Sequence, residues 1–221
     1  MAKGVAVKKK KWVSILAPAV FDFQELGESH VAAPEDLVGR NVSVSLMTLT
    51  GEPQRQSIHV KFKIVGMKDG KAATELVGLR MLASSAKKLV RRRRSKIADS
   101  FIVSLKDGTF VRIKPLVTTR GTVTSALLSD LRKRMRAYIA QYANKLDKDE
   151  FVRLVVQKKF QGGLARTLKK VHPMGPCDIR EFLFVSKEQA KGKLRILPPK
   201  APEKPSEPAE AVEKETAAAQ A

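Results

Sequence analysis

The chain has 221 residues, of which 43 are lysine or arginine and 22 are aspartate or glutamate, so its net charge is +21. This imbalance predicts a polyanionic partner, either nucleic acid or an anionic membrane surface. No apolar run approaches the ~18 residues of a membrane span, and the basic start lacks the apolar stretch and cleavage site of a signal peptide. The single cysteine, Cys177, excludes an intrachain disulfide and fits a reducing, intracellular setting.

The N-terminal segment combines a basic arm with the first apolar stretch. Residues 1–11 form an arm that ends in Lys8, Lys9, Lys10 and Lys11. Trp12, the only tryptophan, opens the stretch WVSILAPAVF, and Pro18 interrupts it, which predicts a short extended piece on either side. The segments LGE, at residues 26–28, and AAPED, at residues 32–36, are predicted to be loops.

A period of two begins at Asn41 and predicts strands. Apolar residues at 42, 44 and 46 alternate with others as far as Met47, and a turn follows at Thr50–Pro53. From residue 58 to 64, apolar residues alternate with His59, Lys61 and Lys63, so this strand has one apolar and one basic face. The pair Asp69-Gly70 is a hairpin signal, with residues 72–79 as the return strand.

The stretch LASSAKKLVRRRRSK, from Leu82 to Lys96, carries seven basic residues and predicts a helix with a cationic ridge. At 100° per residue, the apolar side chains fall on one side, while Lys87, Lys88, Arg91, Arg92 and Arg94 fall on the other. Arg93 lies within the apolar arc, so the helix ends near it or its stem lies along the core. Alone, this run is also typical of a solvated basic face or a nuclear import signal.

Strands are predicted again after this segment. Residues 97–105 form one strand, Asp107-Gly108 a second hairpin turn, and residues 109–116 the partner strand. Arg112 and Lys114 alternate with apolar residues, which predicts another cationic strand face. Pro115 places the end of that strand at a sheet edge, because proline cannot donate a ladder hydrogen bond.

From about Thr122 the period becomes helical. An apolar stripe runs from Leu128 to Tyr142, with three basic residues off it. A second helix is predicted to open at Asp147, with Glu150 completing a capping box, and to stop at Gly162-Gly163. A third short helix, LARTLKKV, would end before Pro173.

The C-terminal part is predicted to close the fold and then lose order. Residues 177–185 form a strand, with a further strand at 194–197. The Pro, Ala, Glu and Lys composition after Pro198 cannot bury enough surface to offset ordering entropy. The expected organisation is therefore a basic arm (1–11), a single α+β domain (12–197) with an antiparallel-rich sheet and a C-terminal helical segment, and a disordered tail (198–221).

No catalytic or metal-binding constellation is evident in the sequence. His30, His59 and His172 lack partners at metal-ligand spacing, and there is no phosphate-binding loop of the Walker type. Ser84-Ser85 beside Lys87 is better explained as a helix start than as a nucleophile pair. The sequence therefore predicts neither an enzyme nor a cofactor.

The basic residues form five clusters spread along the chain, which favours a long polyanion contacted at several places. Aromatic residues make up 5% of the chain and no aromatic pair on a strand face is expected, so backbone and shape recognition fits better than base stacking. The candidate RNA-binding residues are Lys8, Lys9, Lys10, Lys11, Lys87, Lys88, Arg91, Arg92, Arg94, Lys96, Arg132, Lys133, Arg136, Lys158, Lys159, Arg166, Lys169 and Lys170.

The sequence resembles a small-subunit ribosomal protein family shared by archaea and eukaryotes, the S-three-a-e or eukaryotic-type S-one family. The resemblance is carried, in the family's order, by WVSILAPAVF, LGE, LVGRNVSVSLMTLTGE, IHVKFKIV, LVRRRRSKI, DGTFVRIKP and KKVHPMGPCDIREFLFV. These segments cover most of residues 10–190. The short arm is similar to the archaeal form, and the tail has no clear counterpart in the family.

The resemblance implies a non-catalytic rRNA-binding protein on the platform of the small subunit, near the mRNA exit. Its partners would be small-subunit rRNA, neighbouring ribosomal proteins including the S-eleven type, and mRNA near the exit. It implies a cytoplasmic location within the small subunit, no membrane and no homo-oligomer.

Two other functions remain open from the residues alone. A DNA-binding chromatin or regulatory protein would need a recognition helix and usually a symmetric dimer, and no helix–turn–helix pair stands out. A peripheral membrane protein is suggested by the amphipathic helix at 124–142, although such helices in globular chains usually face a core.

Overall fold

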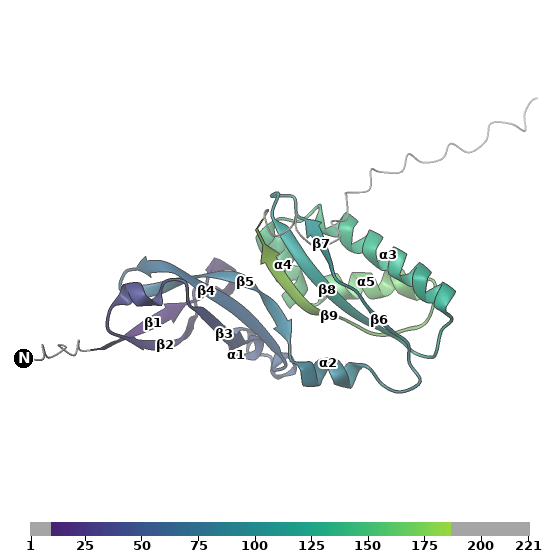
Figure 1. Ribbon diagram of the computed structural model, residues 1–221, viewed down its shortest axis with the longest axis horizontal. Helices are drawn as coiled ribbons and strands as arrows, with labels where there is room; N and C mark the ends of the chain where they lie inside the picture. The colour runs from purple at the N-terminus through teal and green to yellow at the C-terminus, as the bar shows by residue number, and fades with distance from the viewer. Residues whose placement is uncertain (1–9, 187–221) are drawn as a thin grey trace, which may run out of the picture.

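The computed structural model describes residues 10–186 as an elongated α+β fold built on a mostly antiparallel sheet (Figure 1). Strands β1–β5 lie in one half of the molecule, and β6–β9 lie in the other with three of the helices. The strands are β1 (Lys11–Leu16), β2 (Glu25–Val31), β3 (Asn41–Ser45), β4 (Ile58–Lys68), β5 (Lys71–Met81), β6 (Lys96–Ala98), β7 (Phe101–Ser104), β8 (Phe110–Thr119) and β9 (Met174–Val185). The helices are α1 (Leu46–Thr50), α2 (Ala83–Leu89), α3 (Ser125–Ala143), α4 (Lys148–Val156) and α5 (Lys159–Lys169), with 3-10 turns η1 (Ala19–Phe21), η2 (Pro34–Leu37) and η3 (Pro53–Arg55).

The hairpin of β4 and β5 confirms the alternation seen in the sequence. Val60, Phe62 and Ile64 are buried. Asp69 and Gly70 turn the chain with φ of 52° and 75°, the left-handed pair that a two-residue turn of this type requires. The strand predicted from Asn41 is also present but ends at Ser45. There the Ser45 hydroxyl accepts a hydrogen bond from the Met47 amide (3.3 Å) and begins helix α1.

The N-terminal segment differs from the prediction in two places. Residues 26–28, expected to be a loop, belong to β2, which pairs antiparallel with β1. After Pro18 the chain forms the turn η1 rather than an extended piece. The last three residues of the AAPED segment belong to the turn η2. Both loops were expected because glycine and proline usually interrupt regular structure. In β2, strand pairing outweighs that preference.

Strand β8 is central, and this corrects two predictions. The single strand expected at 97–105 is split into β6 and β7, both of which pair with β8. Pro115 therefore does not lie at an edge, because β9 pairs with β8 on the other side. Its missing N–H is tolerated because β6 and β7 pair only on either side of it, and because the β8–β9 register shifts between Lys114 and Pro115.

The helical segment packs on one face of β6–β9. Leu131, Met135 and Ile139 of α3 are fully buried, as the apolar stripe predicts. The predicted capping box is wrong, because the Asp147 side chain makes no capping hydrogen bond. Asp107, from the second hairpin turn, accepts from the Lys148 amide instead (2.8 Å). The predicted stop at Gly162-Gly163 is also wrong, because both glycines lie within α5.

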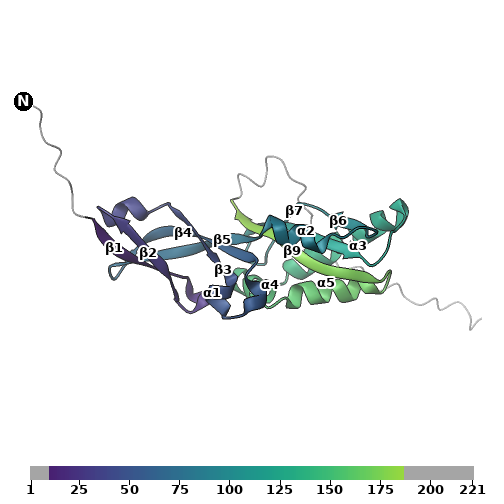
Figure 2. The same cartoon turned by 90° about the horizontal axis from the view of Figure 1, so that it is seen from below.

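Strand β9 joins the two halves of the sheet. It pairs with β8 along most of its length and with the end of β5 through three residue pairs, including Gly78 opposite Leu183. A Cβ on Gly78 would lie 2.8 Å from the Leu183 Cδ2 atom and would overlap the Phe182 carbonyl oxygen. Figure 2 shows β9 with α2 and α5 on different sides of it. The strand expected at 194–197, the tail and residues 1–9 lie outside the described residues.

Candidate nucleic-acid interface

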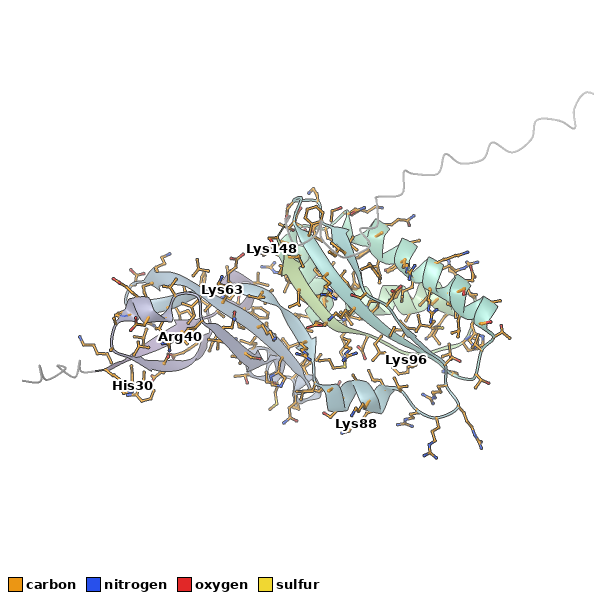
Figure 3. The ribbon with its side chains drawn as sticks, viewed as in Figure 1. His30, Arg40, Lys63, Lys88, Lys96 and Lys148 are labelled. Carbon is orange, nitrogen blue, oxygen red and sulfur yellow. The ribbon has the colours of Figure 1, made fainter. Side chains whose placement is uncertain are left out.

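Helix α2 is held on the face of the sheet opposite to α3, α4 and α5. Its buried residue Ala86 packs with Met81 of β5 and Leu116 of β8, and half-buried Leu89 and Val90 complete this small cluster. Leu116 belongs to this cluster and not to the main core, which its neighbour Val117 joins, because successive side chains of a strand point to opposite faces. One side of α2 is therefore fixed, while Lys87 and Lys88 are exposed. Lys88 is labelled on this helix in Figure 3.

The helix ends at Leu89, well before the predicted end near Arg93. Val90 has extended backbone angles, and the chain then turns to supply β6, whose Ile97 is fully buried. A longer helix would place Lys87 over Arg91 and Lys88 over Arg92 at i,i+4 spacing. Each like-charge pair of this kind costs roughly 0.2–0.5 kcal/mol. The helical projection therefore does not describe the four arginines.

Residues 90–95 connect α2 to β6 in a turn, which we name the arginine loop. Arg91, Arg92 and Arg93 are exposed, and Arg94 is half-buried. Because Arg93 is exposed, the expectation that its stem covers the core is wrong. Its backbone is left-handed, with a φ of 57°. The loop is anchored at its end by Ser95, whose amide donates to the Thr119 hydroxyl (3.0 Å) and whose carbonyl accepts from the Thr119 amide (3.0 Å). The arginines are thus presented from a fixed base.

Two open grooves flank α2. The first, of about 450 Å³, has Lys87, Lys96 and Arg180 around an apolar floor that includes Leu116. The second, of about 550 Å³, is lined by hydroxyl, amide and imidazole groups together with Lys88. None of the residues that line either groove carries a carboxylate. Cationic and neutral polar groups of this kind suit phosphate and ribose oxygens.

The outer face of the sheet beside α2 carries a row of charges that cross-strand pairing brings together. Arg80 of β5 lies opposite Glu181 of β9, which lies opposite Lys114 of β8 and forms an ion pair with it. Burial favours the protonated form of Glu181, but the Lys114 hydrogen bond and the charges of Lys114, Arg80 and Lys61 outweigh it and lower the pKa. The cationic face predicted from Arg112 and Lys114 is present, but part of its charge is neutralised. Arg80 and Arg180 were not predicted as site residues, since only the strand pairing places them beside α2.

The remaining predicted residues are not gathered at this surface. Arg136 is half-buried and paired with Asp99, and Arg132 is half-buried on the same helix, α3. Lys10 and Lys11 are exposed at the start of β1, whereas Lys8 and Lys9 lie outside the described residues. Exposed cations also occur on α3 and along α5, on the other face of the sheet: Lys133, Lys158, Lys159, Arg166, Lys169 and Lys170.

The expectation that no strand face carries an aromatic pair is wrong. Trp12 of β1 lies opposite His30 of β2, and their rings stack with centroids 4.7 Å apart and an interplanar angle of 24°. Trp12 is 67% exposed. The pair could not be predicted because residues 26–28 were assigned to a loop, so that no strand was expected opposite Trp12.

Within residues 10–186, no three His, Cys, Asp or Glu side chains gather as metal ligands would. None of the helices in that range is both long enough and apolar enough to cross a membrane. Cys177 is half-buried, and burial, assisted by the charge of Asp178, raises the pKa of its thiol to about 11.

Comparison with known proteins shows the family to which the chain belongs. The profile of the ribosomal S3Ae family matches residues 3–188. The chain is 33% identical over 182 residues to the small ribosomal subunit protein eS1 of Nanoarchaeum equitans, covering 82% of this chain and 92% of that protein. It is 31% identical over 196 residues to the eS1 protein of Saccharolobus islandicus, covering 87% of this chain and 94% of that protein. The eS1 protein of Saccharolobus solfataricus is 30% identical over the same length. The chain therefore belongs to the ribosomal S3Ae family, whose members are ribosomal proteins and not enzymes.

Proposed function

We propose that this chain is a structural component of the small ribosomal subunit that binds rRNA through α2, the arginine loop and the two grooves beside α2. The observation that carries the proposal is the placement of six cations around one short helix with no carboxylate among the groove residues. These cations are Lys87, Lys88, Arg91, Arg92, Arg93 and Lys96. Guanidinium groups pair with phosphate oxygens in a bidentate fork, which suits the arginine loop to an RNA backbone.

The geometry favours recognition of a folded RNA over recognition of a base sequence. Helix α2 is a ridge with a cationic groove on one side and a groove of hydroxyl and amide groups on the other. Lysine and arginine neutralise phosphates, while neutral groups such as Ser84 and Gln54 can bond the 2′-hydroxyl groups of RNA. Such contacts position a protein on a nucleic acid without reading its bases.

The resemblance to the family supports a finer assignment. In this proposal the chain lies on the platform of the small subunit near the mRNA exit, in the cytoplasm, beside a ribosomal protein of the S-eleven type and close to mRNA. The exposed cations of α3 and α5 lie on the opposite face from α2 and contact RNA or neighbouring proteins there.

The test compares two charge-matched variants of the full chain. One replaces Lys87, Lys88, Arg91 and Arg92 with glutamine. The control replaces Lys159, Arg166 and Lys169 of α5, and Lys170 at its C-terminal end, in the same way. Binding to small-subunit rRNA is measured by filter binding across a range of salt concentrations. We expect the first variant to lose more affinity and to show a smaller salt slope, by roughly one unit per phosphate contact removed.

Equal losses in the two variants would show that binding depends only on net charge, and would contradict the assignment of α2. Duplex DNA of the same sequence serves as competitor in each titration. If DNA competes as well as RNA, a DNA-binding function is favoured over the ribosomal one. Cosedimentation with small ribosomal subunits then checks incorporation, which should weaken more for the first variant than for the α5 variant.

A further inference from the structure

The outer face of the β1–β2 ribbon carries an aromatic stack that belongs to none of the hydrophobic clusters among the described residues. Trp12 and His30 are directly opposite each other, with ring centroids 4.7 Å apart. Both residues are exposed, and Trp12 is 67% accessible to solvent. The core of this half is formed on the other side of the strands by residues such as Val13, Ile15 and Val31. The stack therefore contributes nothing to that core.

A purely structural role explains the stack poorly. A cross-strand aromatic pair stabilises a ribbon by roughly 0.2–1 kcal/mol, and this pair can do so. Burying an indole ring would contribute more, because burial stabilises by about 25 cal/mol per Å² of apolar surface. The fold instead leaves most of the largest apolar side chain in the protein in contact with water. One face of the indole rests on His30, so the remaining exposed surface is available to a second planar ring.

The charges around the stack indicate what that ring belongs to. Lys10 and Lys11 immediately precede Trp12 and are exposed, and they continue the run of lysines that begins at Lys8. The next pair on the same face of the ribbon is Ser14 opposite Glu28, and the Glu28 side chain is exposed. A polyanion therefore approaches from the lysine end of the ribbon and not from the Glu28 end. An aromatic ring beside a short cationic run is the combination that binds single-stranded nucleic acid.

We propose that Trp12 and His30 form a stacking platform for an unpaired base of RNA, with Lys10 and Lys11 holding the adjoining phosphates. The proposal rests on the RNA-binding function proposed above. It adds a second kind of contact at a separate place, since Figure 3 shows His30 at one end of the molecule and Lys88 and Lys96 far from it. A folded RNA is then bound by its backbone at α2 and by a flipped-out or single-stranded base at the end of the ribbon.

Trp12 is the only tryptophan of the chain, so the intrinsic tryptophan fluorescence reports on this site alone. The experiment follows the intrinsic fluorescence of the full chain during titration with a short oligoriboadenylate, with a blunt RNA duplex, and with an abasic strand of the same length. We expect strong quenching by the single strand and little by the duplex or the abasic strand. Equal quenching by the single strand and the abasic strand would overturn the proposal, because it would show that phosphates alone cause the signal.

Affinity measurements on variants complete the test. Trp12→Leu keeps an apolar side chain but cannot stack, so it should weaken single-strand binding by roughly 5- to 150-fold. Duplex binding and the salt slope should not change, because no phosphate contact is lost. Trp12→Phe should retain most of the affinity, and Phe23→Leu, at an exposed aromatic residue on the loop before β2, is the matched control. Circular dichroism verifies that each variant is folded.

The outcomes separate the platform from the function on which it rests. If Trp12→Leu binds the single strand as the original chain does, the platform is wrong while rRNA binding through α2 stands. If Trp12→Leu instead weakens only the association with other small-subunit proteins, the stack is a protein contact and the proposal is likewise wrong. If neither RNA binds the original chain, both proposals fail together.

Discussion

Gly163 of α5 lies directly beneath the Tyr138 hydroxyl of α3, so that a Cβ atom built on this glycine would overlap the phenolic oxygen. Tyr138 is held in place by its neighbours, because its ring stacks on Tyr142 with centroids 5.6 Å apart and meets the edge of Phe160 at 6.2 Å. The glycine therefore permits close approach of two helices, where the sequence pattern indicated a helix end.

The first prediction uses the two adjacent glycines, which lie in the same helix but differ in surroundings. Gly162→Ala should raise the free energy of unfolding by roughly 0.5–1 kcal/mol, because a Cβ there meets open space and alanine favours a helix. Gly163→Ala should lower stability despite the same gain in helix propensity. Thermal or urea unfolding of both variants measures the difference. In a Tyr138→Phe background the cost at Gly163 should shrink, and an undiminished cost there would contradict the steric explanation.

The second prediction separates backbone conformation from charge in the arginine loop. Arg93 has a left-handed φ that glycine adopts without strain. Arg93→Gly should therefore leave the melting temperature unchanged or raise it, while weakening RNA binding by about 1 kcal/mol through loss of a phosphate contact. Arg91→Ala and Arg92→Ala should weaken binding similarly. Lys145→Ala, at an exposed cation after α3, is the control, and Arg93→Gly with unchanged RNA affinity would count against the loop as a contact.

The third prediction concerns acid stability. The folded-state pKa of Glu181 lies below its usual value of 4.5, so its contribution to stability is present above that value. This contribution is lost as the pH falls through the folded pKa. Glu181→Gln should therefore melt at a lower temperature than the original chain at neutral pH, with the gap closing at acidic pH. Melting curves across this range provide the measurement, with Glu150→Gln on the exposed side of α4 as control. A gap that stays constant with pH would exclude ionisation as the cause.

The fourth prediction concerns the only thiol. Because the pKa of Cys177 is raised to about 11, little thiolate exists near pH 8 in the folded protein. Alkylating reagents should therefore react slowly with the folded chain and much faster after unfolding in urea, where the pKa returns toward its usual value. Mass spectrometry of timed samples follows the modification. Rapid labelling of the folded chain at pH 8 would show that the thiol is more accessible than its position on β9 indicates.

Local sequence signals correctly predicted the elements whose structure is determined by residues close together in the sequence. The alternation at 58–64 and the turn Asp69-Gly70 gave a correct hairpin, because burial on one face and a left-handed turn act over a few residues. The stripe of α3 was predicted for the same reason. The errors arose where strands distant in the sequence determine the local structure. Pro115 occupies a central strand because β6 and β7 leave a gap beside it, and no local pattern contains that information.

In the candidate interface, too, local sequence predicted some of the residues, while others are placed there only by strand pairing. The cationic residues of α2 were predicted from the sequence, but the helix ends at Leu89 and the chain continues to β6, whose Ile97 is fully buried. Arg80 and Arg180 join the surface only through the pairing of β5, β9 and β8. The Trp12–His30 stack depends on recognising β2, whose glycine-containing sequence is atypical of a strand.

The position of β9 governs how the chain folds as it is synthesised from its N-terminus. Strands β1–β5 pair among themselves and can assemble early, in the order of their emergence. The sheet cannot become continuous until β9, the last described strand, enters between β5 and β8. Gly78 of β5 pairs with Leu183 of β9, about a hundred positions later in the chain. Pairing between residues so distant in sequence is slow to form. A nascent chain that stops before Met174 therefore carries an unpaired edge on both β5 and β8, which makes the truncated product a target for aggregation or for chaperones.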